Sequence, residues 1–195
     1  MGIVYSICSC LSAYLLWSDS PTVKHVFRVF EDLKTKDSVS LMSFRNSIIE
    51  EITKKRFVRA IDENNSSEVI KLIKEGFPIN SIINEEKVTA LQYASKRGSL
   101  KIMRILIEEG GADVNLGDDT EKWTPLIICS INGHYECVEY LIKKNANKMM
   151  VSENGIIAVD YAREIMGTNI GEKEKKKFEK IVKLLEKYEE KKDDF

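Results

Sequence analysis

The chain of 195 residues has few of the residues on which several classes of protein depend. Its only histidines are His25 and His134, far apart in sequence, which argues against histidine metal sites and Ser-His or Cys-His catalysis. Three prolines and ten glycines exclude fibrous and linker-dominated chains. Charge of one sign is also missing, because 30 Lys and Arg face 31 Asp and Glu, for a net charge of −1. This balance argues against a protein that coats nucleic acid.

The four cysteines are spaced neither as a zinc site nor as a secreted disulfide framework. Cys129 and Cys137 lie in the body of the chain, where we expect them to be small core residues in a reducing compartment. No phosphate-binding loop, G-x-S-x-G elbow or H-E-x-x-H motif is present. Apolar residues (43%) and charged residues (31%) are in the proportions of a soluble globular protein. The sequence therefore predicts no enzymatic activity, no metal and no cofactor.

Residues 1–18 carry no charged side chain and begin Met-Gly, with a serine at position 6. This start matches the motif for N-myristoylation of Gly2. Because one myristoyl chain binds membranes only marginally, a second signal is needed, and palmitoylation of Cys8 and Cys10 would supply it. We therefore predict a lipid anchor at these three residues. Two alternatives stay open: a signal or membrane-inserted segment, for which the apolar run is short, and a helix that packs on the rest of the protein.

Residues 19–56 are predicted to form a helical N-terminal cap. Ser20 followed by Pro21 is typical of a helix N-terminus. A second helical pattern covers residues 39–62, with an apolar stripe that must be buried. We expect these helices to cap the end of the region that follows, and the alternative is that they form a groove for a partner.

Residues 57–195 contain an internal repeat. Residues 89–94 (TALQYA) and 124–129 (TPLIIC) are each followed by a glycine turn and a second apolar helix, and GADVN follows the first unit. Small residues recur 34, 35 and 33 positions apart, at Ala60, Ala94, Cys129 and Ala162. Such a residue lets two helices approach closely, so the period predicts a stack of helix pairs.

These motifs resemble the ankyrin repeat, which implies an all-α solenoid of about four repeats with short β-hairpin-like turns. Each repeat leaves an apolar face that its neighbour must bury. Both central repeats have another residue where the family has its signature histidine, so we expect altered hydrogen bonding at Gln92 and Ile127. His134 matches the family's Gly-His turn and is predicted to be structural. A C-terminal capping helix is expected over residues 172–195, with i,i+4 ion pairs and an apolar stripe of Phe178, Ile181, Val182, Leu184 and Leu185.

The resemblance also implies a protein partner bound on the concave surface. We expect Trp123 and Ile131 to dominate the contact, because an exposed tryptophan beside an aliphatic residue, surrounded by charge, fits an interface hot spot. The alternative is that the tryptophan folds onto its own hairpin. Carried over residue by residue, the family's variable surface positions are Glu85, Glu86, Val88, Lys96, Arg97, Thr120, Glu121, Trp123, Ile131 and Asn132.

The sequence therefore predicts a non-enzymatic ankyrin-repeat scaffold or adaptor, tethered by acyl chains to the cytosolic face of a membrane. It would bind a protein, and neither nucleic acid nor a small-molecule substrate. One alternative is a soluble, cytoplasmic ankyrin-repeat inhibitor or adaptor. The other is an accessory subunit of a membrane-bound enzyme complex.

Overall fold

The structure, a computed structural model, describes residues 38–187. The chain divides into two units, residues 1–50 and residues 51–195, and the boundary falls within the first described helix. The expected helix start at Ser20 lies outside the described residues. Within them the chain forms eight helices and no strand, with one isolated bridge between Ile82 and Thr89. The helices are α3 (Ser38–Asp62), α4 (Ser66–Lys74), α5 (Ala90–Arg97), α6 (Leu100–Glu108), α7 (Pro125–Ile131), α8 (Tyr135–Lys143), α9 (Ala158–Gly167) and α10 (Glu172–Lys187).

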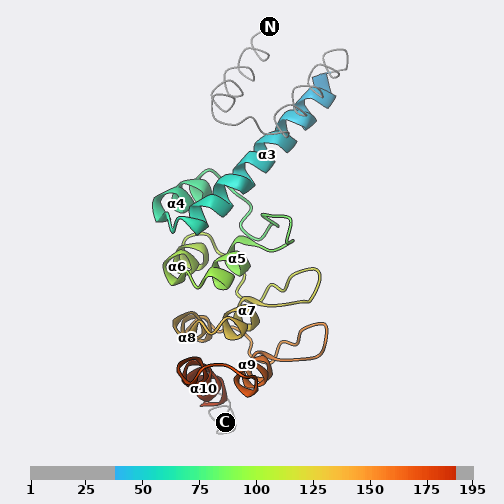
Figure 1. Cartoon of the computed structure of the whole chain (residues 1–195). Coiled ribbons are helices and arrows are strands. Elements are labelled where there is room, and N and C mark those ends of the chain that lie inside the picture. Colours follow the sequence, from blue (N-terminus) through green and yellow to red (C-terminus); the bar gives the residue numbers. More distant parts are fainter. Residues whose placement is uncertain (1–37, 188–195) are drawn as a thin grey trace, which may run out of the picture. The chain divides into compact units, whose positions relative to one another are not determined.

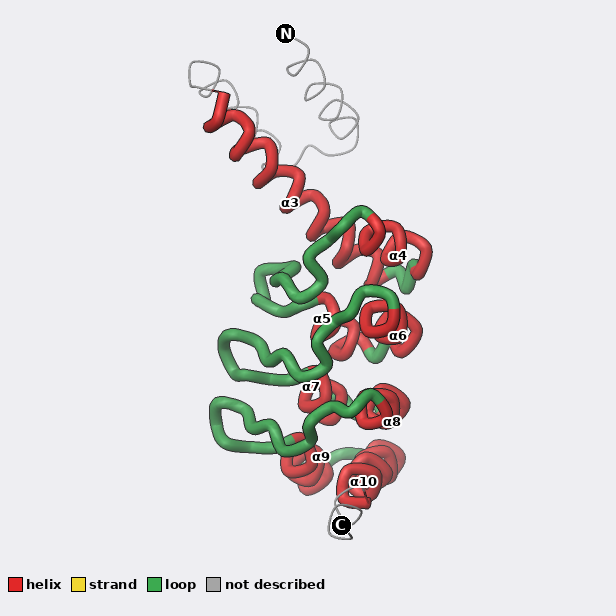
Figure 2. The backbone as a smooth tube through the Cα atoms, turned by 180° about the vertical axis from the view of Figure 1, so that it is seen from behind, coloured by secondary structure: helices red, strands yellow, loops and turns green. Residues whose placement is uncertain are grey.

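The helices of the second unit stack in two rows, as the repeat period predicts. Helices α5, α7 and α9 contact one another in one row, and α4, α6, α8 and α10 form the other (Figure 1). Three long loops, seen in green in Figure 2, join the rows and project to one side. We call them finger 1 (residues 75–89), finger 2 (109–124) and finger 3 (144–157). The fold is the expected all-α solenoid, and the short hairpin-like turn is seen in the bridge of finger 1.

Capping residues and glycines next to each helix determine where the inner helices, α5 and α7, begin and end. The Thr89 hydroxyl accepts a hydrogen bond from the Gln92 N–H in a capping box, and Thr124 caps α7 in the same way, with a proline in its first turn. Gly98 and Gly133 both have φ of +67°, which glycine adopts without steric cost. The predicted caps and glycine turns are therefore confirmed, and they fix where each helix pair bends.

The core runs through all the repeats of the second unit. The predicted small residues at the helix contacts, Ala60, Ala94, Cys129 and Ala162, are at most 2% exposed. Large side chains such as Leu106 and Leu141 fill the space between the rows. The burial of Cys129 and Cys137 confirms their prediction as core residues.

Helix α10 closes the C-terminal end with the predicted stripe. Four of its five residues are buried, and Leu184 is half-buried. The expected i,i+4 ion pairs within α10 are absent from residues 172–187, and this prediction was wrong. The Glu186 carboxylate instead pairs with Arg163 of α9, at 2.6 Å. Four residues, 168–171, join the two helices, because α9 runs on to Gly167.

Candidate partner-binding site

A cleft of about 280 Å³ lies where fingers 1 and 2 meet the inner helices α5 and α7. Ile131 and Trp123, the pair expected to dominate binding, both line it, and we call it the Trp123 cleft. The structure thus gathers residues from two repeats around one apolar centre. Eight of the ten predicted partner-binding residues line it: Glu86, Val88, Lys96, Thr120, Glu121, Trp123, Ile131 and Asn132.

The other two predicted residues lie elsewhere. Glu85 lines a neighbouring cleft between finger 1 and α3. The Arg97 guanidinium pairs with the Asp62 carboxylate at 2.6 Å and donates a hydrogen bond to the Tyr93 hydroxyl at 3.2 Å. It thus joins α5 to α3 at the surface of the stack, outside the lining of the Trp123 cleft.

Trp123 is half-buried, not exposed as the sequence suggested. Its indole N–H donates a hydrogen bond to the Tyr161 hydroxyl of α9 at 3.3 Å, and the two rings meet edge to face at 6.1 Å. The Tyr161 hydroxyl in turn donates to the Ser152 hydroxyl of finger 3 at 3.0 Å. The tryptophan therefore packs on the next repeat and not on its own hairpin. This support fixes the ring as a wall of the cleft, which lowers the entropy lost when a partner binds.

Charged and polar groups form the rim of the Trp123 cleft. The Lys96 ammonium pairs with the Glu86 carboxylate at 2.8 Å, and about half of each side chain is exposed. Thr120 and Glu121 are exposed at the tip of finger 2. An exposed ion pair of this kind contributes little to stability, so its charges are available to a partner at small cost. The arrangement of apolar centre and polar rim is that of a protein interface.

The side chain of Gln92 stabilises finger 2 through hydrogen bonds to its backbone. Its buried amide N–H₂ donates to the carbonyl oxygens of Leu116 and Trp123, at 3.0 and 3.1 Å, and so joins the two sides of the finger. Its amide oxygen accepts from the Thr89 N–H at 2.7 Å. The corresponding Ile127 is 1% exposed and apolar, so it packs in the core instead.

The tip of finger 2 depends on the side chain of Asp118. One oxygen of its carboxylate accepts hydrogen bonds from the backbone N–H groups of Thr120, Glu121 and Lys122, at 2.7–3.1 Å. It also accepts from the Thr120 hydroxyl at 2.9 Å. The Asp-x-Thr spacing of an Asx turn is the signal that could have revealed this role.

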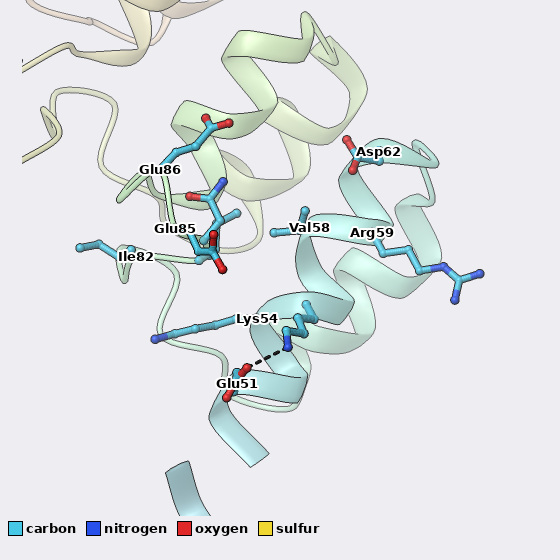
Figure 3. Close-up of a pocket in the computed structure, with 11 residues that line it drawn as sticks. Glu51, Lys54, Val58, Arg59, Asp62, Ile82, Glu85 and Glu86 are labelled. Carbon is cyan, nitrogen blue, oxygen red and sulfur yellow. Dashed lines mark ion pairs between the residues drawn. The ribbon is translucent and has the colours of Figure 1, made fainter. Parts of the chain in front are cut away.

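A larger cleft of about 700 Å³ lies beside the first, on the helix for which the sequence left a partner groove open as the alternative. It lies between finger 1 and residues 51–62 of α3, where Figure 3 shows Val58 between Arg59 on the helix and Ile82 on the finger. Glu86 lines both clefts, so they are neighbours. The cleft forms because α3 continues past residue 56 to Asp62, in agreement with the helical pattern over residues 39–62.

His134 is structural, as predicted. Its Nε2 lies 3.1 Å from the Lys96 carbonyl oxygen of the preceding repeat, and its ring covers Gly98, where an added Cβ would lie 2.5 Å from Nδ1. Burial raises the pKa of the Cys129 thiol well above its ordinary value, which makes this thiol a poor nucleophile.

Residues 38–187 lack the features of a metal site and of a membrane span. No group of three or more His, Cys, Asp or Glu side chains there could hold a metal ion. None of the helices in this range combines the length and the apolar character that crossing a bilayer requires. The predicted lipidation residues Gly2, Cys8 and Cys10 lie outside the described part of the chain.

Comparison with known proteins agrees with this geometry. The family model for ankyrin repeats, in three copies, matches residues 57–152. The rat ankyrin repeat and SAM domain-containing protein 6 is 28% identical over 141 residues, which are 70% of this chain and 16% of that protein. The zebrafish ankyrin repeat domain-containing protein 29 is 36% identical over 58 residues, 30% of this chain and 19% of the relative. The Caenorhabditis elegans ankyrin repeat and KH domain-containing protein mask-1 is 30% identical over 82 residues, 42% of this chain and 3% of that protein.

These matches cover less than a fifth of each relative's length, so what they share with this chain is the repeat region. That region coincides with the stacked helix pairs, the capped inner helices and the projecting fingers described above. The chain therefore contains ankyrin repeats, which the family model places over residues 57–152.

Proposed function

We propose that this protein is a non-enzymatic adaptor that captures a protein partner in the Trp123 cleft while its N-terminus is anchored to the cytosolic face of a membrane. The observation that supports capture is the position of Trp123 and Ile131 in one cleft, within a rim of exposed charge. The tryptophan is held from behind by Tyr161, so its ring is oriented before a partner arrives. A buried aromatic anchor with a polar rim is the usual composition of a binding hot spot.

The cleft can be tested with a charge placed in its apolar centre. Ile131→Lys should reduce capture of the partner at least about tenfold, because a buried ammonium in the interface lacks a compensating group. The measurement is quantitative mass spectrometry of proteins retained by the immobilised full-length chain, with circular dichroism as the check of folding. Val151→Lys is the matched control, because Val151 is also an aliphatic residue, 49% exposed, outside the lining of the cleft.

We expect at least one protein to be retained by the wild type and the Val151 variant but lost from the Ile131 variant. If all three retain the same proteins in equal amounts, the Trp123 cleft is not the binding surface. A second readout is fluorescence. The chain has two tryptophans, so in a Trp17→Phe background the emission of Trp123 alone should change when the retained partner is added.

The tether rests on the sequence of residues 1–18 and is tested separately. In cells, Gly2→Ala and the double variant Cys8→Ser/Cys10→Ser should move the protein from the membrane fraction to the soluble fraction, because each removes one of two required anchors. Intact mass should show the acyl groups on the wild type and their loss from the variants. A wild type that is soluble and carries no lipid would favour the soluble adaptor, and a Gly2→Ala variant that stays on membranes without lipid would favour direct insertion.

A further inference from the structure

One exposed face of α10 is made of lysines, and the exposed Glu172 and Glu174 lie outside it. Five lysines lie at spacings of three and four residues, so they share one face of the helix. All five are exposed, on the side opposite the buried stripe. They fall within an arc of about 80° and extend over roughly 21 Å of helix. We call this surface the lysine face: Lys173, Lys176, Lys180, Lys183 and Lys187.

The acidic residues of α10 lie outside this arc. Glu172, Glu179 and Glu186 follow one flank of the helix, and the charge of Glu186 is compensated by Arg163 of α9 at 2.6 Å. Two glutamates stand four residues before a lysine of the face, yet in residues 172–187 no lysine forms an ion pair within 4.0 Å. The positive charges of the face are therefore uncompensated by this part of the chain.

This separation of charges works against the stability of the helix. Like charges three or four residues apart destabilise a helix, whereas opposite charges at the same spacing stabilise it. Glu172 and Glu179 offset only part of this repulsion, at Lys176 and Lys183. A face of one sign is therefore best explained by an interaction with an opposite charge.

The composition of the face indicates which kind of anionic partner it fits. No aromatic side chain interrupts it, so it offers no platform on which nucleic-acid bases could stack. No apolar side chain lies at its centre, so it lacks the hot spot of a protein interface. Lysine, unlike arginine, does not bind phosphate or carboxylate in two-pronged fashion. What remains is diffuse attraction between a straight row of point charges and a surface of anionic lipid headgroups.

We propose that the lysine face binds the anionic lipids of the membrane leaflet to which the chain is anchored. This inference rests on the proposed membrane location and deepens it, because a basic patch adds to the attachment that the acyl chains provide. The lysine face would then add an electrostatic contact, sensitive to salt, to the apolar contact of the lipid chains.

The test uses the full-length chain produced without acyltransferases, so that the face is measured apart from lipidation. Its binding to vesicles of phosphatidylcholine, with and without phosphatidylserine, is measured by co-sedimentation. One variant changes the lysine face to glutamine at all five positions. The matched control changes five exposed lysines elsewhere, with the same change in net charge: Lys71, Lys74, Lys87, Lys101 and Lys143.

Each lysine near an anionic surface strengthens binding roughly fivefold, so the lysine-face variant should bind the phosphatidylserine vesicles at least about tenfold more weakly than the control. Binding of the wild type should fall as salt is added. Equal weakening of both variants would show that net charge alone matters and would overturn the proposal. No binding of the wild type at low salt, equal binding without phosphatidylserine, or preferential binding to duplex DNA would each overturn it as well. Loss of the acyl anchor appears only in the separate Gly2→Ala experiment, so the two proposals can fail independently.

Discussion

Replacing Gln92 with leucine is expected to lower the free energy of unfolding by roughly 2–4 kcal/mol. The leucine fits the buried position in size but removes three hydrogen bonds of the amide, at 2.7, 3.0 and 3.1 Å. The Thr89 N–H and the carbonyl oxygens of Leu116 and Trp123 would lose these partners in a region that is largely shielded from water. Thermal unfolding followed by circular dichroism should show a fall in Tm of about 5–15 °C.

The control for this change is Gln92→His, the residue that the ankyrin family has at this position. An imidazole can donate from one ring nitrogen and accept at the other, so it can replace part of the amide's bonding. We expect the histidine variant to unfold at a temperature between those of the leucine variant and the wild type. If the leucine variant is as stable as the wild type, the amide does not hold finger 2, and the position of Trp123 must be set by Tyr161 alone.

The fold was predictable because each of its determinants lies close to the others in sequence. The threonine caps act on a residue three positions away, and the glycine turns depend on the φ angle of one residue. The small residues at the helix contacts repeat with the period of the structure, so their spacing revealed the stack. These signals act within one repeat, where sequence patterns are most informative.

The details of the binding site were less predictable, because they depend on residues far apart in sequence. Trp123 is oriented by Tyr161, 38 residues away, through a contact that no local pattern encodes. The cleft beside α3 is lined by Val58 of the helix and Ile82 of finger 1, which no local pattern brings together. The ion pair between Arg163 and Glu186 depends on how α9 packs against α10, which the sequence pattern did not show. The exposure of Trp123 is thus determined by Tyr161, a residue of the next repeat.

Replacing Gly98 with alanine is expected to destabilise the protein by roughly 2–4 kcal/mol, from two separate causes. The φ of +67° is strained for any residue with a Cβ. The new Cβ would also lie 2.5 Å from the His134 ring, which must move and lose its contact with the Lys96 carbonyl group. Urea denaturation of the variant and the wild type measures the difference.

A matched glycine allows the two causes to be separated. Gly155 has a φ of +74° and nothing within 4 Å of its added Cβ, so Gly155→Ala should cost only the backbone strain, about 1 kcal/mol. In a His134→Ala background the obstructing ring is gone, and Gly98→Ala should then cost about as much as Gly155→Ala. Should Gly98→Ala cost the same with and without the histidine, the ring does not resist the new methyl group. In that event the contact between repeats depends on the helix cores and not on the Gly-His turn.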